Sequence, residues 1–455
     1  MILFILFTGL ILRLISLNQS LWLDEATTSN VASKLSFGEI FSKFLPGDFH
    51  PPLYYLLMKI WVSIFGNSEI ALRIPSVIFG LATIYITYII GKKLVNKNSG
   101  LIAAALLATS GLAIYYSQEA RMYSLAAFLI SFLVFSLVKT IKEDRVGDWV
   151  TFSILLALIF LTDYVAILII PAFWIYAIFS KQKISWLKKF VMSHIILVAT
   201  IALWLPILLK QLKSGFLVGT TSPLWYQILG QISLKNLGLI PVKFMIGRIT
   251  FDNKLLYGLI VVLAGVLFGF LLFKSIRLIR LIKNLPIVWI WLIVPIFLGA
   301  VISFKVPVLS YFRFLFCLPA FYLLIACGVS KLGKYKNFFL TIVLSLNLLT
   351  SGYYLFNSKF HREDWRGIAS IIGSGKIVFP ADSQKEAMIY YKKDGQIINS
   401  AQLTKNDREV WLSRYVWEIF DPGDTARLRI ESLGYNKTST HNFNGVVFFR
   451  YARSN

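Results

Sequence analysis

Two adjacent carboxylates, Asp24 and Glu25, stand in a polar stretch that follows the first apolar segment of the chain. The aromatic residue Trp22 lies just before them. A carboxylate close to an apolar boundary can hold a raised pKa and act as a general base toward a hydroxyl group. Asp24 can equally cap a helix that starts at Glu25, and the two roles are compatible. We expect Asp24 to be the base, with Glu25 positioning the second reactant or binding a divalent cation, and Trp22 contacting substrate.

A histidine and two tyrosines belong to a second motif, HPPLYY, at residues 50–55. The two prolines hold the chain extended before the apolar helix that follows. His50 is thereby presented at the polar side of that helix, in the same loop as Asp24. We expect His50 to contact an anionic group or the second reactant, and Tyr54 to contact substrate.

The third motif, SQEARMY at residues 117–123, is a polar turn between two apolar segments. A structural turn requires only one or two polar residues, and this one has a surplus. It carries an amide, an acid, a base and a tyrosine, namely Gln118, Glu119, Arg121 and Tyr123. The surplus favours a binding role for these four side chains.

The composition places the chain in a membrane. Of its 455 residues, 57% are hydrophobic, against about 45–50% in soluble domains. They form long runs, and about 17–25 apolar residues cross the hydrocarbon core of a bilayer. The net charge of +24 would suggest nucleic acid in a soluble protein. Here the basic residues fill short gaps between apolar runs, as the positive-inside rule predicts for cytoplasmic loops, so we expect no nucleic-acid partner.

Five basic gaps set the predicted topology, because two spans must separate each cytoplasmic gap from the next. The result is about 11 spans, with the N-terminus in the cytoplasm and the C-terminal region outside. The gaps contain Lys92, Lys93 and Lys97; Lys139, Lys142 and Arg145; Lys181, Lys183, Lys188 and Lys189; Lys274, Arg277, Arg280 and Lys283; and Lys331, Lys334 and Lys336. The expected spans are 1–17, 72–90, 99–116, 122–138, 149–161, 165–179, 186–209, 255–273, 287–302, 312–329 and one that begins at 338.

Two segments require a choice. Residues 52–65 are apolar but short, and a crossing there would reverse every basic gap, so we place them along the outer surface as an interfacial helix. Residues 149–179 form one long tilted helix or two short spans. We favour two, because Asp163 at mid-helix would be unfavourable in lipid.

The outer face then carries two long loops, 18–71 and 211–253, and a polar C-terminal region, 357–455. Residues 1–356 form the membrane domain. The C-terminal region is large enough for a small α/β domain, with strands expected at 376–380 and 445–451.

Arginines at the outer ends of the predicted spans break the positive-inside pattern: Arg13, Arg73, Arg121 and Arg313, with Arg248 in the second outer loop as a fifth candidate. Each can extend to lipid headgroups on its own. A shared anionic ligand explains the set more economically, because arginine binds phosphate through a planar fork of donors. A phosphate carried on a membrane lipid fits their depth.

The three motifs together resemble those of glycosyltransferase family 39, a group of membrane proteins that includes protein O-mannosyltransferases and lipid A aminoarabinose transferases. The resemblance covers residues 1–365. It rests on the order and spacing of five short motifs, WLDE (22–25), HPPLYY (50–55), LRIPS (72–76), SQEARMY (117–123) and YFR (311–313).

The resemblance implies an all-α polytopic membrane protein of the GT-C type, a polyprenyl-phosphate sugar donor and a reaction on the extracytoplasmic face. The family's catalytic aspartate falls on Asp24. The basic residue that often lies near the donor phosphate, before the family's Pro-Pro, falls on His50. Relatives of bacterial type often show His-Tyr after the fifth span, where this chain has Asp163-Tyr164. We place Asp163, with Tyr311, among the expected substrate contacts.

The resulting hypothesis is an inverting transferase of the cytoplasmic membrane. Arg73, Arg121, Arg313 and His50 bind the donor phosphate and stabilise its developing charge, while Asp24 deprotonates an acceptor hydroxyl. The acceptor is a glycan, a lipid or a protein, and a divalent cofactor stays open because no metal-ligand spacing is evident.

Two alternatives are a lipid or solute transporter and a ligase that moves a whole glycan from a lipid diphosphate. The absence of an internal sequence repeat counts against a transporter.

Overall fold

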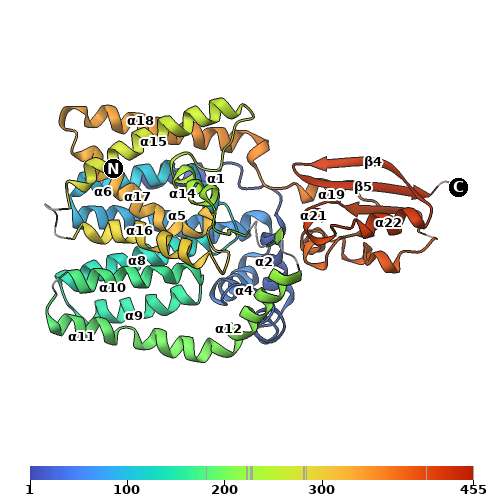
Figure 1. Ribbon diagram of the computed structural model, residues 1–455, viewed down its shortest axis with the longest axis horizontal. Coiled ribbons are helices and arrows are strands. Elements are labelled where there is room, and N and C mark those ends of the chain that lie inside the picture. Colours follow the sequence, from blue (N-terminus) through green and yellow to red (C-terminus); the bar gives the residue numbers. More distant parts are fainter. Residues whose placement is uncertain are drawn as a thin grey trace.

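A bundle of long helices lies beside a small sheet domain, which sits at one end of the bundle (Figure 1). The computed structural model describes residues 1–180, 182–221, 224–225, 229–279, 282, 284–405 and 407–453. Three predicted cytoplasmic residues, Lys181, Arg280 and Lys283, lie outside the described residues, as does part of the loop predicted at 211–253. The predicted fold class, an all-α membrane bundle with a small C-terminal α/β domain, is confirmed.

Each predicted span contains a helix or an interrupted pair of helices. In the described chain, six helices are long and apolar enough to cross a membrane, and α6 with α7, bent by 62°, adds a seventh if the pair is one span. The helices of the bundle are α1 (Ile2–Leu14), α5 (Glu69–Leu94), α6 (Lys97–Thr109) with α7 (Gly111–Ser117), α8 (Tyr123–Lys142), α9 (Val146–Phe160), α10 (Ile169–Phe179), α11 (Ile184–Met192) with α12 (Ile195–Thr221), α15 (Lys254–Ile276), α16 (Pro286–Ile302), the 3-10 helix η3 (Tyr311–Cys317) with α17 (Leu318–Ser330), and α18 (Lys336–Phe356).

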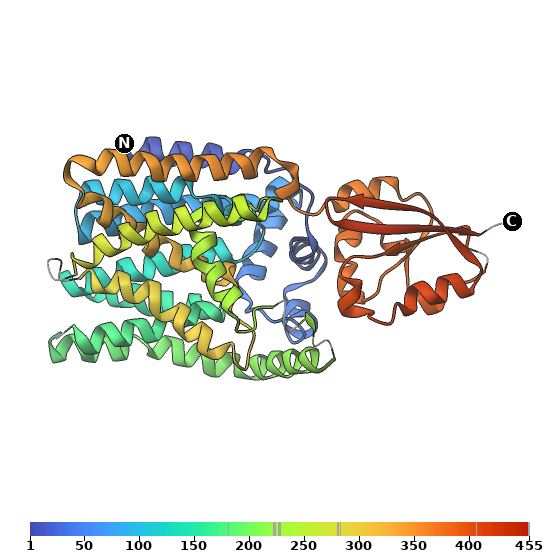
Figure 2. The same ribbon diagram turned by 45° about the horizontal axis from the view of Figure 1, so that its top comes forward.

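Predicted cytoplasmic gaps meet at one end of this bundle. The gap after α5 is joined to the gap after α8 by an ion pair of 3.0 Å between Lys93 and Glu143. The gap after α8 is joined to the one after α10 by an ion pair of 2.7 Å between Lys189 and Asp144. The connection between α17 and α18 lies at the end away from the sheet domain (Figure 2). The grouping agrees with the predicted alternation of spans, while the side that faces the cytoplasm stays a prediction.

Residues 149–179 form two helices, α9 and α10, joined by a turn and the 3-10 helix η2 (Val165–Leu168). Asp163 stands in the turn, where its Oδ1 accepts a hydrogen bond of 2.9 Å from the N–H of Val165. A short polar side chain that bonds the backbone two residues ahead is a common way to end one segment and start another. The region therefore consists of two helices, while the expectation that each of them spans the membrane stays a prediction.

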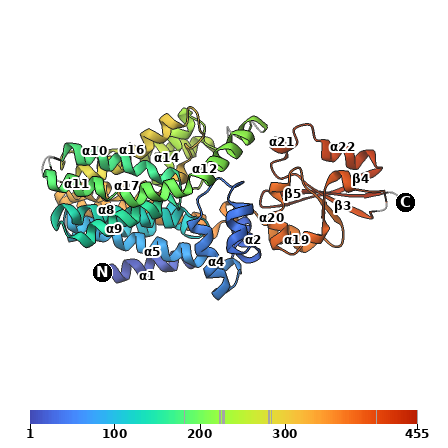
Figure 3. The same ribbon diagram turned by 90° about the horizontal axis from the view of Figure 1, so that it is seen from below.

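The first predicted outer loop is folded into helices α2 (Leu23–Lys34), α3 (Phe37–Glu39), the π-helix η1 (Ile40–Phe44) and α4 (Leu53–Phe65). Helix α2 packs on α4, and both lie at the end of the bundle that faces the sheet domain (Figure 3). The N-cap of α2 is Trp22, whose N–H donates to Glu25 Oε2 at 3.4 Å. The cap proposed at Asp24 is therefore wrong, because the helix begins at Leu23 and Asp24 lies inside its first turn.

The second predicted outer loop is also largely helical. Helix α12 continues to Thr221, well beyond its predicted end, and α14 (Leu234–Ile246) follows.

The C-terminal region holds a five-stranded mixed sheet with strand order β2-β1-β3-β5-β4. The predicted strands correspond to β1 (Lys376–Val378) and β5 (Val446–Arg453). The strands that the sequence analysis missed are β2 (Ile397–Ile398), β3 (Glu409–Ser413) and β4 (Tyr435–Phe443), and the surrounding helices are α19 (Trp365–Ile371), α20 (Glu386–Tyr390), α21 (Trp417–Phe420) and α22 (Thr425–Ser432).

Candidate functional site

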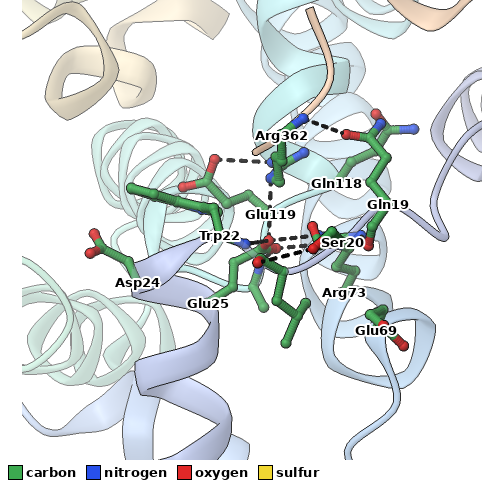
Figure 4. A network of polar contacts seen from close by, with 12 residues as sticks. Gln19, Ser20, Trp22, Asp24, Glu25, Glu69, Arg73, Gln118, Glu119 and Arg362 are labelled. Carbon is green, nitrogen blue, oxygen red and sulfur yellow. Dashed lines mark hydrogen bonds and ion pairs between the residues drawn. The ribbon is translucent and has the colours of Figure 1, made fainter. Parts of the chain in front are cut away.

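The two adjacent carboxylates of α2 face different surroundings (Figure 4). Successive residues of an α-helix point about 100° apart, since one turn takes 3.6 residues. The side chain of Glu25 is 0% exposed, whereas that of Asp24 is 39% exposed. Asp24 can therefore meet a second molecule, and Glu25 cannot.

Glu25 is the centre of a buried charge network. Its two oxygens accept a forked pair of hydrogen bonds from Arg73, 2.9 Å from Nε to Oε1 and 2.6 Å from Nη2 to Oε2. The N–H of Ala120 donates a third bond of 2.8 Å to Oε1. These partners correct the expectation that Glu25 positions the acceptor or binds a cation, because its oxygens are already engaged inside the protein.

The sequence predicts that Arg73 binds the donor phosphate, but in the structure its guanidinium binds groups of the protein itself. Its Nη1 donates to the carbonyl oxygens of Leu17 and Gln19, both at 2.7 Å, and its Nη2 also reaches the carbonyl of Ser20 at 2.9 Å. A guanidinium has five N–H donors, and with the two bonds to Glu25 all five are used. Arg73 fastens the chain after α1 to α2 and has no donor left for phosphate.

A second arginine enters the network from the far end of the chain. Arg362, which follows α18, lies with its Nε 3.3 Å from Glu25 Oε2 and donates from Nη2 to Glu119 Oε2 at 3.0 Å (Figure 4). Its side chain is 1% exposed. The predicted substrate contact at Glu119 is therefore corrected, since its buried carboxylate pairs with Arg362. Arg362 belongs to none of the sequence motifs, and the only sequence signal for it is the charged run at 361–364 just after the last predicted span.

The two glutamates of the network differ in acidity. Burial acts to raise the pKa of Glu25, but the charges of Arg73 and Arg362 and the bonds to the carboxylate outweigh it, so the pKa is lowered. For Glu119 burial prevails over the opposing charge of Arg362, and the pKa is raised to about 7.

Glu119 gives a pH-dependent stability. Its pKa is raised from 4.5 to about 7, so the folded protein holds this proton more tightly than the unfolded chain does. The stabilisation is full at low pH and is lost as the pH rises from 4.5 to about 7. We expect the melting temperature of the wild type, relative to Glu119→Gln, to fall over this range and then to level off. Thermal unfolding of both proteins in detergent micelles measures this difference, and parallel curves would contradict the raised pKa.

Asp24 belongs to a second cluster on the exposed side of α2. Its Oδ2 lies 3.5 Å from Nη2 of Arg121, whose side chain is 4% exposed. The same nitrogen of Arg121 lies 3.1 Å from Nε2 of His50, and His50 Nδ1 lies 3.3 Å from Oδ2 of Asp48. Tyr55 donates to this Asp48 oxygen at 2.9 Å. The structure thus brings together three of the predicted residues, Asp24, His50 and Arg121, from three separate segments.

Asp48, which the sequence analysis did not select, holds His50 in place. Its burial acts to raise the pKa of its carboxyl, but the charge and hydrogen bond of His50 outweigh this effect and lower the pKa. With Nδ1 turned to this carboxylate, Nε2 of His50 is left to face Arg121.

Asp163 and Arg313 lie close to this cluster. Burial raises the pKa of Asp163, against a bond from Val165 and the charges of His50, Arg313 and Arg121. Arg313 is half-buried and donates from Nη1 to the carbonyl of Pro307 at 2.7 Å, which uses only part of its donor capacity.

Aromatic rings form one wall beside these charges. Tyr123 is buried and packs edge-on against Tyr116 at 5.3 Å and against Phe312 at 5.4 Å, measured between ring centroids. Tyr311 is half-buried and also packs against Phe312, with 5.6 Å between the ring centroids. Trp22, also half-buried, stands beside Asp24 in Figure 4.

Other predicted contacts lie elsewhere. Gln118 is buried and fully occupied: its Nε2 donates to the carbonyls of Arg13 and Ile15, and its Oε1 accepts from Tyr354 at 2.7 Å. Its predicted substrate contact is corrected to a brace between α1 and α18. Tyr54 is 2% exposed and belongs to the core between α4 and the bundle.

Two further arginines of the outer set are separate from the Asp24 cluster. Arg13 is buried in the bundle and donates from Nε to Oγ of Ser117 at 3.0 Å. Arg248 is exposed and lies over the ring of Tyr115 at 4.2 Å. Arg13 is therefore a bundle brace, while Arg248 keeps its guanidinium accessible.

The C-terminal region contributes a further buried carboxylate, Glu363. Tyr415 donates to Glu363 Oε1 at 2.9 Å, and Oε2 of Glu363 is buried with no hydrogen-bond partner among the described residues. Burial raises the pKa of Glu363, and the charge of Asp24 adds to the rise. Within the described chain, no group of three or more His, Cys, Asp or Glu side chains has the geometry to hold a metal ion.

Comparisons with known proteins agree with the fold. Residues 49–209 match the family model described as dolichyl-phosphate-mannose-protein mannosyltransferase. ArnT from Cupriavidus metallidurans bound to undecaprenyl phosphate superposes with a TM-score of 0.58 at 12% identity, over 98% of this chain and 97% of that chain. The archaeal oligosaccharyltransferase AglB from Archaeoglobus fulgidus, in complex with an inhibitory peptide and a dolichol-phosphate, gives a TM-score of 0.55 at 13% identity, over 100% of this chain and 74% of that chain.

No curated protein matches the chain in sequence. Since identities of 12% and 13% establish shared architecture only, the structural likeness speaks for the fold, and the family match speaks for residues 49–209. The resemblance to glycosyltransferase family 39 is confirmed over residues 49–209, and the chain has the GT-C fold.

Proposed function

We propose that the protein transfers a sugar from a polyprenyl-phosphate carrier to an acceptor hydroxyl, at the membrane face next to the C-terminal domain. The observation that carries the proposal is the pairing of an accessible Asp24 with a buried Arg121, 3.5 Å apart, with His50 on the same guanidinium. A base beside an anion-binding cation is the arrangement that a displacement at a sugar phosphate requires. The family match over residues 49–209 and the polyprenyl-phosphate ligands of the two similar structures support the choice of donor.

In this mechanism Asp24 accepts the proton of the acceptor hydroxyl, and the hydroxyl oxygen bonds to the anomeric carbon. The bond between that carbon and the phosphate oxygen breaks, and its electron pair leaves with the phosphate. Arg121, His50 and Arg313 stabilise the charge that develops there. One displacement from the face opposite the leaving phosphate inverts the anomeric centre.

Purified protein in proteoliposomes tests the proposal. The liposomes carry an undecaprenyl-phosphate sugar labelled in the sugar, with host membrane extract as the source of acceptor. We expect label to leave the carrier and to appear in covalent product, together with free undecaprenyl phosphate. Label that crosses the bilayer while it stays on the carrier would indicate a transporter. Transfer only from a lipid diphosphate carrying a whole glycan would indicate a ligase.

Arg121→Ala is expected to weaken donor binding. The substitution removes the buried cation and leaves Asp24 and His50 without a shared partner. Hydrogen bonds to charged groups contribute about 1.5–3 kcal/mol, so the Kd for undecaprenyl phosphate should rise by about 10- to 100-fold. Tryptophan fluorescence titration with undecaprenyl phosphate measures the change. Arg145→Ala is the matched control, because Arg145 is an exposed arginine in a predicted cytoplasmic gap. Equal affinity of Arg121→Ala and wild type would remove Arg121 from the phosphate site.

A further inference from the structure

Arg362 contacts both glutamates of the buried network. Among the residues that the structure describes, it is the one buried side chain of the C-terminal region that does so. It reaches Glu25 at 3.3 Å and Glu119 at 3.0 Å, and all three side chains are at most 2% exposed. Its own backbone is fixed as well, because its N–H donates to Oε1 of Gln19 at 3.0 Å. Its guanidinium also lies over the ring of Tyr115 at 4.5 Å.

Both glutamates lead directly to the proposed active residues. Glu25 is the chain neighbour of Asp24, and its Oε1 holds the N–H of Ala120, which is the chain neighbour of Arg121. Glu119 precedes Ala120 and Arg121 in the same short turn. A shift of Glu25 is therefore transmitted through one peptide unit to Asp24, and a shift of Glu119 through two peptide units to Arg121.

We propose that Arg362 is a positioning residue of the active site, which fixes the base Asp24 relative to Arg121 by holding Glu25 and Glu119 together. The C-terminal domain then contributes to the geometry of the active site and not only to acceptor binding. This inference rests on the proposed function for its kinetic consequences, but its structural consequence is independent of any donor.

The charges explain why an arginine is required. Without Arg362, Glu25 keeps its forked pair with Arg73, whereas Glu119 loses its ion pair and keeps only the more distant charges of Arg248 and Arg121. An uncompensated buried charge is strongly unfavourable, so Glu119 would take up a proton or the turn at 118–122 would move. Either response loosens the link between Asp24 and Arg121.

Arg366 is a matched control in the same segment. It also binds the first loop, with Nη2 3.0 Å from the carbonyl oxygen of Asn18 and Nη1 3.5 Å from Glu69. Its side chain is 46% exposed and does not belong to the Glu25 network. If Arg362 only docked the C-terminal domain, replacing Arg366 would have a comparable effect.

The kinetic test compares Arg362→Met, Arg366→Met and the double variant Arg362→Met/Glu119→Gln in the proteoliposome assay. A misplacement of about 1 Å can lower a rate by about 100-fold, and we expect a loss of that size in kcat for Arg362→Met, with the donor KM changed by less than about threefold. Arg366→Met should keep kcat within about threefold of wild type. The double variant should regain at least about tenfold over Arg362→Met, because it removes the unpaired carboxylate.

The donor-independent test places a nitroxide on Asp24→Cys. The native cysteines, Cys317 and Cys327, are buried, so the label reports on the first turn of α2. We expect Arg362→Met to sharpen the spectrum through greater mobility, the added Glu119→Gln to reverse the change, and Arg366→Met to leave it unaltered. If Arg362→Met does not fold, Arg362→Lys replaces it, since it keeps the charge and shortens the reach. We then expect a smaller change in the same direction.

Equal losses of kcat in Arg362→Met and Arg366→Met without rescue would overturn the proposal, as would nitroxide spectra that do not respond to Arg362. A wild type that turns over no donor would contradict the proposed function, while the spectra would still decide the positioning role.

Discussion

Replacing Asp24 by asparagine is expected to lower turnover of the lipid-linked sugar by about 10²- to 10⁴-fold, the contribution that a positioned general base commonly makes. The amide has the size of the carboxylate, but it cannot accept the hydroxyl proton. The donor site should survive, because Arg121 keeps its contact with His50 at 3.1 Å. The expected signature is a collapse of kcat with a nearly unchanged Kd for undecaprenyl phosphate.

The assay that decides this is single-turnover transfer in proteoliposomes, with Asp252→Asn as the control. Asp252 is 92% exposed and pairs with Lys359, away from α2, so its loss should leave turnover unchanged. Transfer by Asp24→Asn at a rate close to wild type would show that another group removes the proton. Glu363 would then be the next candidate, because it is the carboxylate on which the charge of Asp24 acts.

Arg73→Met is expected to destabilise the fold by about 3–5 kcal/mol, which is the usual effect of removing one partner of a buried ion pair. Glu25 would keep only the longer contact to Arg362, at 3.3 Å. The carbonyl oxygens of Leu17, Gln19 and Ser20 would lose their shared donor. Chemical unfolding in mixed micelles, followed by tryptophan fluorescence, measures the change.

The control for Arg73 is Arg145→Met, which removes an exposed ion pair of 3.5 Å and should change the stability by less than about 1 kcal/mol. The experiment also separates the two roles considered for Arg73. A phosphate ligand would raise the donor Kd in a stable protein. A structural brace would lower the stability and leave the Kd of the folded fraction close to wild type.

The sequence predicted the membrane fold well because hydropathy and charge act locally. Every expected span contains helix, and the turn at Asp163 follows from the poor fit of a carboxylate in lipid. The sheet was predicted less well. The hairpin of β4 and β5 turns through Asn444 and Gly445, both with positive φ, and this dipeptide is a strong hairpin signal that was available in the sequence. Strand β2 has only two residues, and both β2 and β3 pair in parallel with β1, which is a non-local contact.

The site was predicted in part for a similar reason. Short motifs identified Asp24, His50 and Arg121, and the fold brings them together. A motif does not show which of two neighbouring carboxylates faces solvent, because that depends on how α2 packs. It also does not pair residues that are distant in sequence, such as Arg362 and Glu119, 243 residues apart.

This separation has a consequence for biogenesis. During synthesis Glu25 meets its first cation early, since Arg73 follows it by 48 residues, but the partner of Glu119 is made 243 residues later. Until then the ribosome-bound chain carries a carboxylate at 118–122 that stays hydrated or protonated at the membrane surface. The arrangement of Asp24 and Arg121 is therefore completed only after the last helix of the bundle has been inserted, so an incompletely synthesised chain carries the residues of the site without its geometry.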